Sequence, residues 1–219
     1  VMNQVNPLDI TTRTLYNPTK SFRNFILPGL LAAIVQVAIA IAGAERGWEN
    51  QRRQLSFTGH CKIILQWSLV GFLSIFLTMA VQWFIYGMPY RGTVAGGILL
   101  TWMFSACITL LGYIMGSFFE ERTFCTQISC ILVLPTAIFG GYTWPVLAMP
   151  ASMRLLAKAI PFTYYSNSIR NLCLKPVRIE HLLSDYIAML CFLGIGIAVL
   201  YLVTGFKSRR VNALEVTAV

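Results

Sequence analysis

Charged residues are scarce in this sequence, and five long stretches lack them entirely. Only 11% of the 219 residues are Asp, Glu, Lys or Arg, against 57% that are hydrophobic, and the mean hydropathy is +0.67. Soluble domains carry about 25% charged residues, so this composition excludes the soluble globular classes. The uncharged stretches are residues 24–44, 63–86, 93–119, 126–153 and 186–206.

Each of these stretches is long enough for a helix to cross the ~30 Å hydrocarbon core of a bilayer. A helix satisfies its own backbone polar groups, which lipid cannot do. We therefore predict an all-α, polytopic membrane protein: a helical bundle with about five transmembrane helices and additional short re-entrant or interfacial helices.

The sequence also lacks the common signatures of catalysis and nucleotide binding. It contains no G-x-x-x-x-G-K-[ST] loop, no G-x-S-x-G, no H-E-x-x-H and, among its six cysteines, no C-x-x-C. Neither His60 nor His181 stands in metal-ligand spacing with a cysteine. The middles of the apolar stretches hold no Asp, Glu, Lys, Arg or His, which argues against a proton-driven transporter and an intramembrane protease. We expect no catalytic residue, metal or cofactor in this chain, so uphill transport would need energy from another polypeptide.

The charged residues permit two other interpretations. Glu180, His181 and Asp185 cluster near one end of the last stretch. They could perform acid–base chemistry in a lipid-modifying transferase, and a non-transporting membrane scaffold is the other alternative. The net charge of +9 comes from basic residues in the connectors. That placement favours charges flanking a membrane over a nucleic-acid surface.

The apolar pattern divides the chain as follows. We assign residues 1–23 to the end of an external domain or a linker, and 24–219 to one transmembrane domain. Its predicted spans are residues 24–44, 63–86, 93–117, 127–147 and 184–206. Residues 45–62 form a polar connector, and residues 141–183, cut by several prolines, form an external region with re-entrant or interfacial pieces. Lys and Arg are denser in 45–62, 118–126 and 207–219 than in the opposite connectors, which places these three segments in the cytoplasm.

Several segments resemble one known family. Residues 141–150 read Gly-Tyr-Thr-Trp-Pro-Val-Leu-Ala-Met-Pro, followed by Pro161-Phe162-Thr163 and by Arg170 with Leu174-Lys175. Residues 16–18 with 25–30, residues 44–49 and residues 117–127 match further elements in the same order. Together they resemble the ABC-2-type transporter permeases, the membrane subunits of bacterial ATP-binding-cassette exporters.

The resemblance implies a permease that exports a hydrophobic or amphipathic substrate, such as a drug, a lipid or a lipid-linked compound. ATP and Mg²⁺ would be bound by a separate cytoplasmic ATPase subunit. Two permease copies would pair as a homodimer or a heterodimer in the bacterial inner membrane, with a periplasmic adaptor as a further candidate partner.

The resemblance also implies roles for individual residues. The ATPase-coupling residues would be Glu45, Arg46, Trp48, Glu49, Arg52 and Arg53, with Trp48 as an aromatic anchor. The substrate pathway would be lined by Gln36, Thr136, Phe139 and Tyr142. The external gate and re-entrant segment would contain Gly140, Gly141, Pro145, Met149, Pro150 and Pro161.

This sequence departs from the family pattern in two places. Gly47-Trp48 stands where the family has Gly-Thr, and the polar residues Gln51-Arg52-Arg53 follow. The family has six spans and a large external domain between the first two, whereas this sequence matches the last five spans and the end of that domain.

Overall fold

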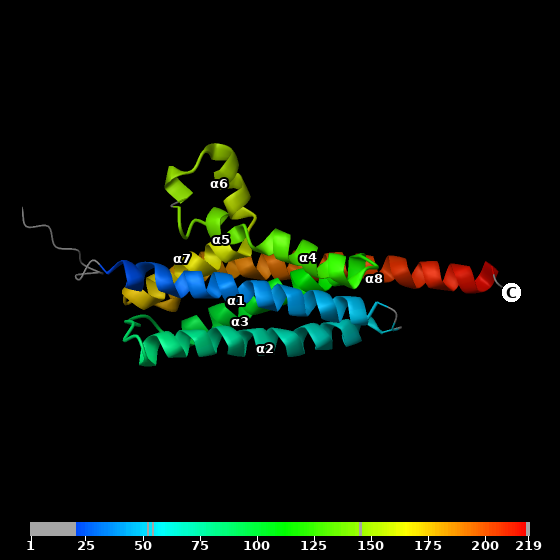
Figure 1. The fold of residues 1–219 in the computed structure, drawn as a ribbon, viewed down its shortest axis with the longest axis horizontal. Helices are drawn as coiled ribbons and strands as arrows, with labels where there is room; N and C mark the ends of the chain where they lie inside the picture. The colour runs from blue at the N-terminus through cyan, green and yellow to red at the C-terminus, as the bar shows by residue number, and fades with distance from the viewer. Residues whose placement is uncertain (1–20, 52, 54, 145, 218–219) are drawn as a thin grey trace, which may run out of the picture.

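The chain folds into a bundle of long helices that run nearly parallel or antiparallel to one another (Figure 1). The computed structural model describes residues 21–51, 53, 55–144 and 146–217. For residue 147 and residues 206–217 it describes the backbone alone. In chain order the elements are α1 (Phe22–Glu49), α2 (Phe57–Phe84), α3 (Val94–Phe118), α4 (Arg122–Val133), α5 (Thr136–Phe139), η1 (Val146–Ala148), α6 (Ala151–Lys158), α7 (Pro161–Leu174), η2 (Ile179–Leu182) and α8 (Leu183–Thr217).

The predicted fold class is confirmed. Five helical segments are long and apolar enough to cross a membrane: α1, α2, α3, the broken segment Arg122–Phe139 and the segment Ile179–Gly205. The described residues form helices and no strand. The protein is therefore an all-α, multi-pass membrane bundle.

The helix boundaries differ from the predicted ones, mainly at one end of the bundle. Glu45 to Glu49 continue α1, and α2 already begins at Phe57, so the predicted connector 45–62 shortens to residues 50–56. The polar residues at the end of α1 and the start of α2 are helical, because a helix can continue beyond the hydrocarbon layer into water. Ser56 fixes the start of α2, since its side chain accepts a hydrogen bond from the backbone N–H of Gly59.

The fourth predicted span, 127–147, is shorter and lies earlier in the chain. Its helical part runs from Arg122 to Phe139 and is divided at Leu134-Pro135 into α4 and α5. Proline lacks the N–H that would continue the helix, which accounts for the break. The chain turns at Gly140 and Gly141, where Gly141 has a φ of +78° that favours glycine.

Glycines allow α1 and α3 to approach each other closely. Gly43 and Gly47 on α1 face Gly112 and Gly116 on α3, each pair spaced four residues apart. A Cβ atom on Gly116 would overlap the carbonyl oxygen of Ala44, and one on Gly47 would overlap that of Tyr113. Small residues at this spacing are typical of close helix packing in membranes. This crossing fixes the polar end of α1 and the C-terminal part of α3 against each other.

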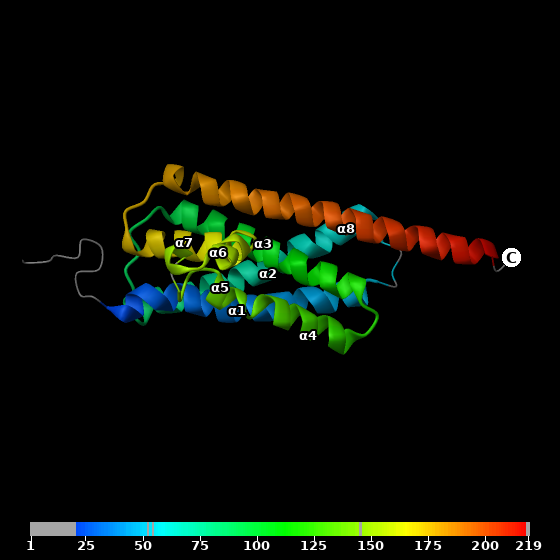
Figure 2. The same cartoon turned by 90° about the horizontal axis from the view of Figure 1, so that it is seen from above.

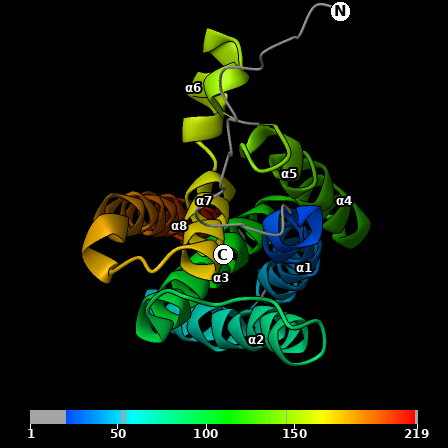
Figure 3. The ribbon, with the colours of Figure 1, turned by 90° about the vertical axis from the view of Figure 1, so that its left-hand side faces the viewer.

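At the opposite end, α7 lies inside the bundle, whereas α6 stands apart from it (Figures 1 and 3). Helix α7 packs against α1, α3 and α8. Its Tyr165 ring stacks on Phe104 of α3 with ring centres 4.2 Å apart, and both side chains are fully buried. Helix α8 packs along α3 on the outside and extends beyond the other helices (Figure 2). The predicted external region, 141–183, thus contains one helix of the core.

Candidate functional site

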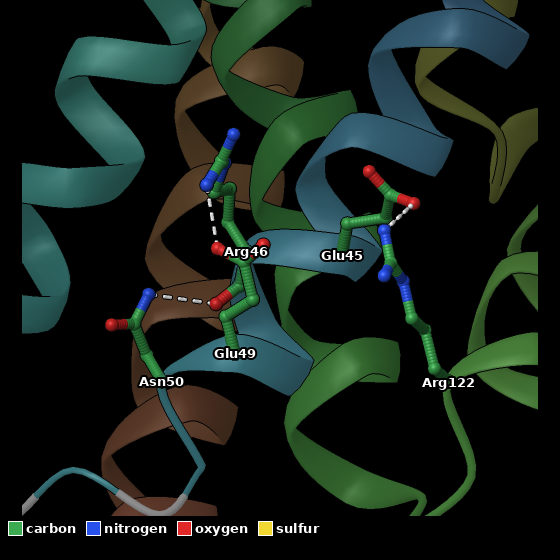
Figure 4. A network of polar contacts seen from close by, with 5 residues as sticks. All are labelled: Glu45, Arg46, Glu49, Asn50 and Arg122. Atoms are coloured by element: carbon green, nitrogen blue, oxygen red, sulfur yellow. Dashed lines mark hydrogen bonds and ion pairs between the residues drawn. The ribbon is translucent and has the colours of Figure 1, made fainter.

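The polar end of the bundle joins the C-terminus of α1 to the N-terminus of α4. A Glu45 carboxylate oxygen lies 2.8 Å from a guanidinium nitrogen of Arg122, and both side chains are partly exposed. Figure 4 shows the two side chains reaching toward each other from separate helices. The ion pair therefore links the last turns of α1 to the first residue of α4, which follows the second polar connector at residues 119–121.

A second set of contacts joins the end of α1 to the connector at residues 119–121. The indole N–H of Trp48 donates a hydrogen bond of 2.7 Å to the backbone carbonyl of Glu120. The guanidinium carbon of Arg122 lies 5.8 Å from the centre of the Trp48 ring. The side-chain amide of Gln51 donates to the carbonyls of Gly116 and Phe119. Trp48, predicted to anchor an ATPase, is half-buried against its own chain, and its contact with a partner stays a prediction.

The other predicted coupling residues divide into two groups. Arg46 pairs with Glu49 at 2.5 Å within α1 (Figure 4). The guanidinium of Arg46 also lies 4.4 Å from the centre of the Trp67 ring on α2. Arg46 therefore braces α1 against α2, and both Arg46 and Glu49 are only partly exposed. Arg53 is exposed, and Arg52 lies outside the described residues.

Midway along the bundle, two predicted pathway residues contact each other. The side-chain amide of Gln36 donates a hydrogen bond of 3.1 Å to the hydroxyl of Thr136, which in turn donates to the carbonyl of Val133 at 2.6 Å. Gln36 is fully buried, so it does not line an open path within one copy of the chain. Its hydrogen bond connects α1 to the first residue of α5, just after the helix break.

Thr136 and Phe139 line an apolar pocket of about 300 Å³ between α3, α4, α5 and the segment 156–162. Apolar side chains from these elements form most of the wall: Ile108, Leu111, Leu132, Val133, Leu156, Ile160 and Phe162. Pro161, predicted to belong to the external gate, begins α7 and also lines this pocket. The pocket therefore suits an apolar molecule or an apolar side chain of a partner.

Tyr142, also predicted to line the pathway, packs against α1, and its role in a pathway stays a prediction. Its hydroxyl donates to the carbonyl of Phe25 at 2.8 Å and accepts from the N–H of Gly29 at 2.9 Å. These two backbone groups, four residues apart, would pair with each other in a regular helix. The side chain is 2% exposed, and burial raises the pKa of its hydroxyl, so the group stays protonated. Gly29 is required here because a Cβ atom would overlap the Tyr142 ring.

Arg170 of α7 completes this contact. It donates a hydrogen bond of 2.7 Å to the carbonyl of Tyr142. Its guanidinium lies 4.1 Å from the centre of the Tyr142 ring and 4.2 Å from that of Phe25. We call Tyr142, Phe25, Gly29 and Arg170 the tyrosine latch, since they hold the bend after α5 against the start of α1.

The remaining predicted gate residues surround this latch. A Cβ atom on Gly140 would lie 2.6 Å from a ring carbon of Phe162, so the bend passes directly over α7. Met149 is buried, and Pro150 precedes the first residue of α6. Pro145 lies outside the described residues. The structure thus brings the described gate residues to one end of the bundle.

Glu180, His181 and Asp185, the candidate residues of a transferase, lie on η2 and at the start of α8. Glu180 and His181 are exposed, whereas Asp185 is half-buried and accepts a hydrogen bond from the hydroxyl of Ser168 on α7. In the part of the chain that the structure describes, no group of three His, Cys, Asp or Glu residues is placed to hold a metal ion.

Two features of the sequence point to contacts that the structure shows. Arg170 is the single charged residue between Pro161 and Leu174, and such a residue in an otherwise uncharged helix indicates a specific partner. The G-x-x-x-G spacings at Gly43 and Gly112 predict a close helix crossing, which the structure shows.

Known proteins share this sequence pattern. The model of the ABC-2 family transporter proteins matches residues 2–206. A probable multidrug ABC transporter permease, YbhS, from Escherichia coli is 26% identical over 179 residues, covering 76% of this chain and 47% of the relative. ABC transporter G family member 20 from Dictyostelium discoideum is 25% identical over 228 residues, covering 96% of this chain and 31% of the relative.

A second E. coli relative, the probable multidrug ABC transporter permease YbhR, is 19% identical over 185 residues, with 80% and 50% coverage. The chain thus spans about half the length of the E. coli relatives that it matches. No solved structure matches it. Because the family model covers nearly the whole chain, over the same five spans that form the bundle, the protein belongs to the ABC-2 family of transporter proteins.

Proposed function

We propose that this chain is the membrane permease of an ATP-driven exporter that moves a hydrophobic or amphipathic substrate out of the cytoplasm or the inner leaflet. ATP and Mg²⁺ would be bound by a separate ATPase subunit. The names of the E. coli relatives, probable multidrug permeases, support this class of substrate.

One observation carries the proposal: α1 contacts the segment 122–142 at three levels. Glu45 pairs with Arg122 at the polar end, Gln36 with Thr136 in the middle, and Gly29 with Tyr142 at the far end. We call this row of contacts the α1–α4 seam. It connects the surface where an ATPase would dock to the bend that would form the external gate.

The seam suggests how the two ends would be coupled. An ATPase that binds the polar connectors would move α1 and α4 together at their cytoplasmic ends, because the Glu45–Arg122 pair and the Trp48 hydrogen bond join them. The break at Pro135 would let α5 and the following bend respond separately. ATP binding would then shift the population from an inward-accessible to an outward-accessible arrangement.

The apolar pocket beside Thr136 and Phe139 supports an apolar cargo. Exposed apolar side chains continue from it along α4, α5 and α6, at Ile131, Ile138 and Leu155. We propose that a second permease copy faces this surface, as a homodimer or a heterodimer, and that the cargo passes between the copies. The bacterial inner membrane is the proposed location, and a periplasmic adaptor is a further candidate partner.

The test is to co-express the permease with candidate ATPase subunits, purify the complex in mild detergent, and measure ATP hydrolysis with and without an amphipathic cation such as ethidium. Glu45→Gln and Arg122→Gln should each lower the ethidium-stimulated rate at least about five-fold. The exchange Glu45→Arg with Arg122→Glu should restore it, since the pair acts by joining two connectors of one chain.

Arg178→Gln provides the control, because Arg178 is exposed and lies at the other end of the bundle. If no ATPase co-purifies, or if both single variants keep the stimulated rate, the proposed coupling is wrong. Loss of a lipid-transfer activity in a triple variant of Glu180, His181 and Asp185, with an intact ATPase complex, would instead favour the transferase.

A further inference from the structure

An apolar pocket of about 270 Å³ opens between α2, α3 and α7, away from the α1–α4 seam. Buried side chains of Met88, Ile169 and Cys173 form its floor. Exposed side chains, including Trp83 and Val94, form its rim. The pocket is therefore built from the core of the bundle and opens at its surface.

Both hydroxyl groups that line this pocket already donate hydrogen bonds to backbone carbonyls. The hydroxyl of Thr101 donates to the carbonyl of Gly97 at 2.7 Å, and that of Tyr90 donates to the carbonyl of Thr93 at 3.1 Å. The interior thus offers a ligand apolar contact rather than hydrogen bonds. An engineered cavity of about 150 Å³ with apolar walls is enough to bind benzene, so this pocket has room for a longer hydrocarbon segment.

The pocket faces the side of the bundle where lipid has access. In Figure 3, the ends of α2 and α3 lie across the bundle from α4 and α5, the helices proposed to face a second copy. Phe84 is the last residue of α2, so the pocket lies where that span meets the bilayer interface. Trp83 and Tyr90, on its wall, are residue types that favour this depth.

Two arginines lie next to segments of the chain that line the pocket. The guanidinium of Arg23 donates a hydrogen bond of 3.1 Å to the carbonyl of Tyr86, two residues after the pocket residue Phe84. Arg91 directly follows the pocket residue Tyr90, and its side chain is exposed. Among the described residues, neither arginine forms an ion pair with a carboxylate. The mouth therefore has positive charge beside an apolar interior.

We infer that this pocket binds one acyl chain of a phospholipid with an anionic headgroup, whose phosphate lies beside Arg91 and Arg23. The apolar interior accommodates the chain, and the two guanidinium groups attract the headgroup, since arginine recognises phosphate with charge-assisted hydrogen bonds. The site lies apart from the proposed pathway. It depends only on the membrane location of the bundle, so it stands whether or not the proposed export function is correct.

The experiment measures lipid binding to the delipidated chain by native mass spectrometry, with dioleoyl-phosphatidylglycerol and dioleoyl-phosphatidylcholine as the two probes. One phosphatidylglycerol should bind at the lowest lipid concentrations, at least about five-fold better than phosphatidylcholine. Ala80→Trp, which places an indole in the pocket, should reduce this first binding event at least ten-fold. Val94→Trp fills the pocket from α3 and should have the same effect.

The matched control is Leu77→Trp, since Leu77 lies one turn earlier on α2, is 65% exposed and does not line the pocket. It should bind phosphatidylglycerol as the unmodified chain does. The double variant Arg23→Gln, Arg91→Gln should bind both lipids equally. Full binding to a folded Ala80→Trp or Val94→Trp protein, equal loss in the Leu77→Trp protein, or a lipid preference that survives the arginine substitutions would overturn the inference.

Discussion

The tyrosine latch makes a quantitative prediction for Tyr142→Phe. The substitution keeps the ring between Gly29 and Arg170 and removes only the hydroxyl, which forms two hydrogen bonds to α1. Each such bond contributes about 1 kcal/mol net, and a buried group left unpaired costs about 1–3 kcal/mol. The freed N–H of Gly29 and carbonyl of Phe25 are four residues apart and can partly pair with each other. We therefore expect the free energy of unfolding to fall by about 1–2 kcal/mol.

Unfolding in mixed micelles of increasing SDS content would measure the stability, and hydrogen exchange of the Gly29 amide would measure the local effect. A loss of about 1–2 kcal/mol corresponds to roughly 5- to 30-fold faster exchange if the latch opens locally. Tyr86→Phe is the matched control, because Tyr86 is half exposed and its hydroxyl has no hydrogen bond to the residues that the structure describes. Unchanged stability and unchanged Gly29 exchange in the Tyr142→Phe protein would refute the assignment of the hydroxyl to α1.

Three further predictions concern the packing and the seam. Gly116→Ala should lower the free energy of unfolding by about 1–3 kcal/mol by forcing α1 and α3 apart, whereas Gly194→Ala, where no atom lies within 4 Å of an added Cβ, should not destabilise the protein. Thr136→Val should cost about 1–3 kcal/mol in the same unfolding assay, because the buried amide of Gln36 loses its acceptor, while Thr136→Ser should retain most of the stability. Arg170→Lys should weaken the latch and speed hydrogen exchange at the start of α1. An ammonium group cannot stack on two rings and also hold the carbonyl as a guanidinium does. An exchange rate equal to that of the wild type would contradict this role.

The sequence indicated the fold class reliably because the signal is strong and local. Uncharged runs of more than twenty residues have few structural solutions other than membrane helices, and the five candidate spans overlap the five predicted ones. The ends of the spans were less predictable. Glu45 to Glu49 are polar, which is typical of a connector, yet they continue α1 because Gly47 packs against α3 and Arg46 against Trp67.

The candidate site was also predicted only in part from the sequence. The order of the motifs placed Thr136, Phe139 and Tyr142 near the broken span, but it did not distinguish their environments. Thr136 and Phe139 line a pocket, whereas the Tyr142 side chain is buried and forms hydrogen bonds with the backbone of α1. The partner of Tyr142 lies 117 residues away in sequence, and no periodicity within one helix predicts such a contact.

The sequence alone was enough to predict a multi-pass membrane protein and the approximate positions of its five candidate spans. Those properties depend on the free energy of transferring side chains and backbone from water to lipid, and the composition of each segment sets that free energy independently of the other segments. Only the tertiary structure decided which helices meet. Three contacts each require two distant segments to lie together: the glycines of α1 against those of α3, the ion pair between α1 and α4, and the hydrogen bond from Tyr142 to the backbone of α1. The local sequence of either segment does not encode that placement.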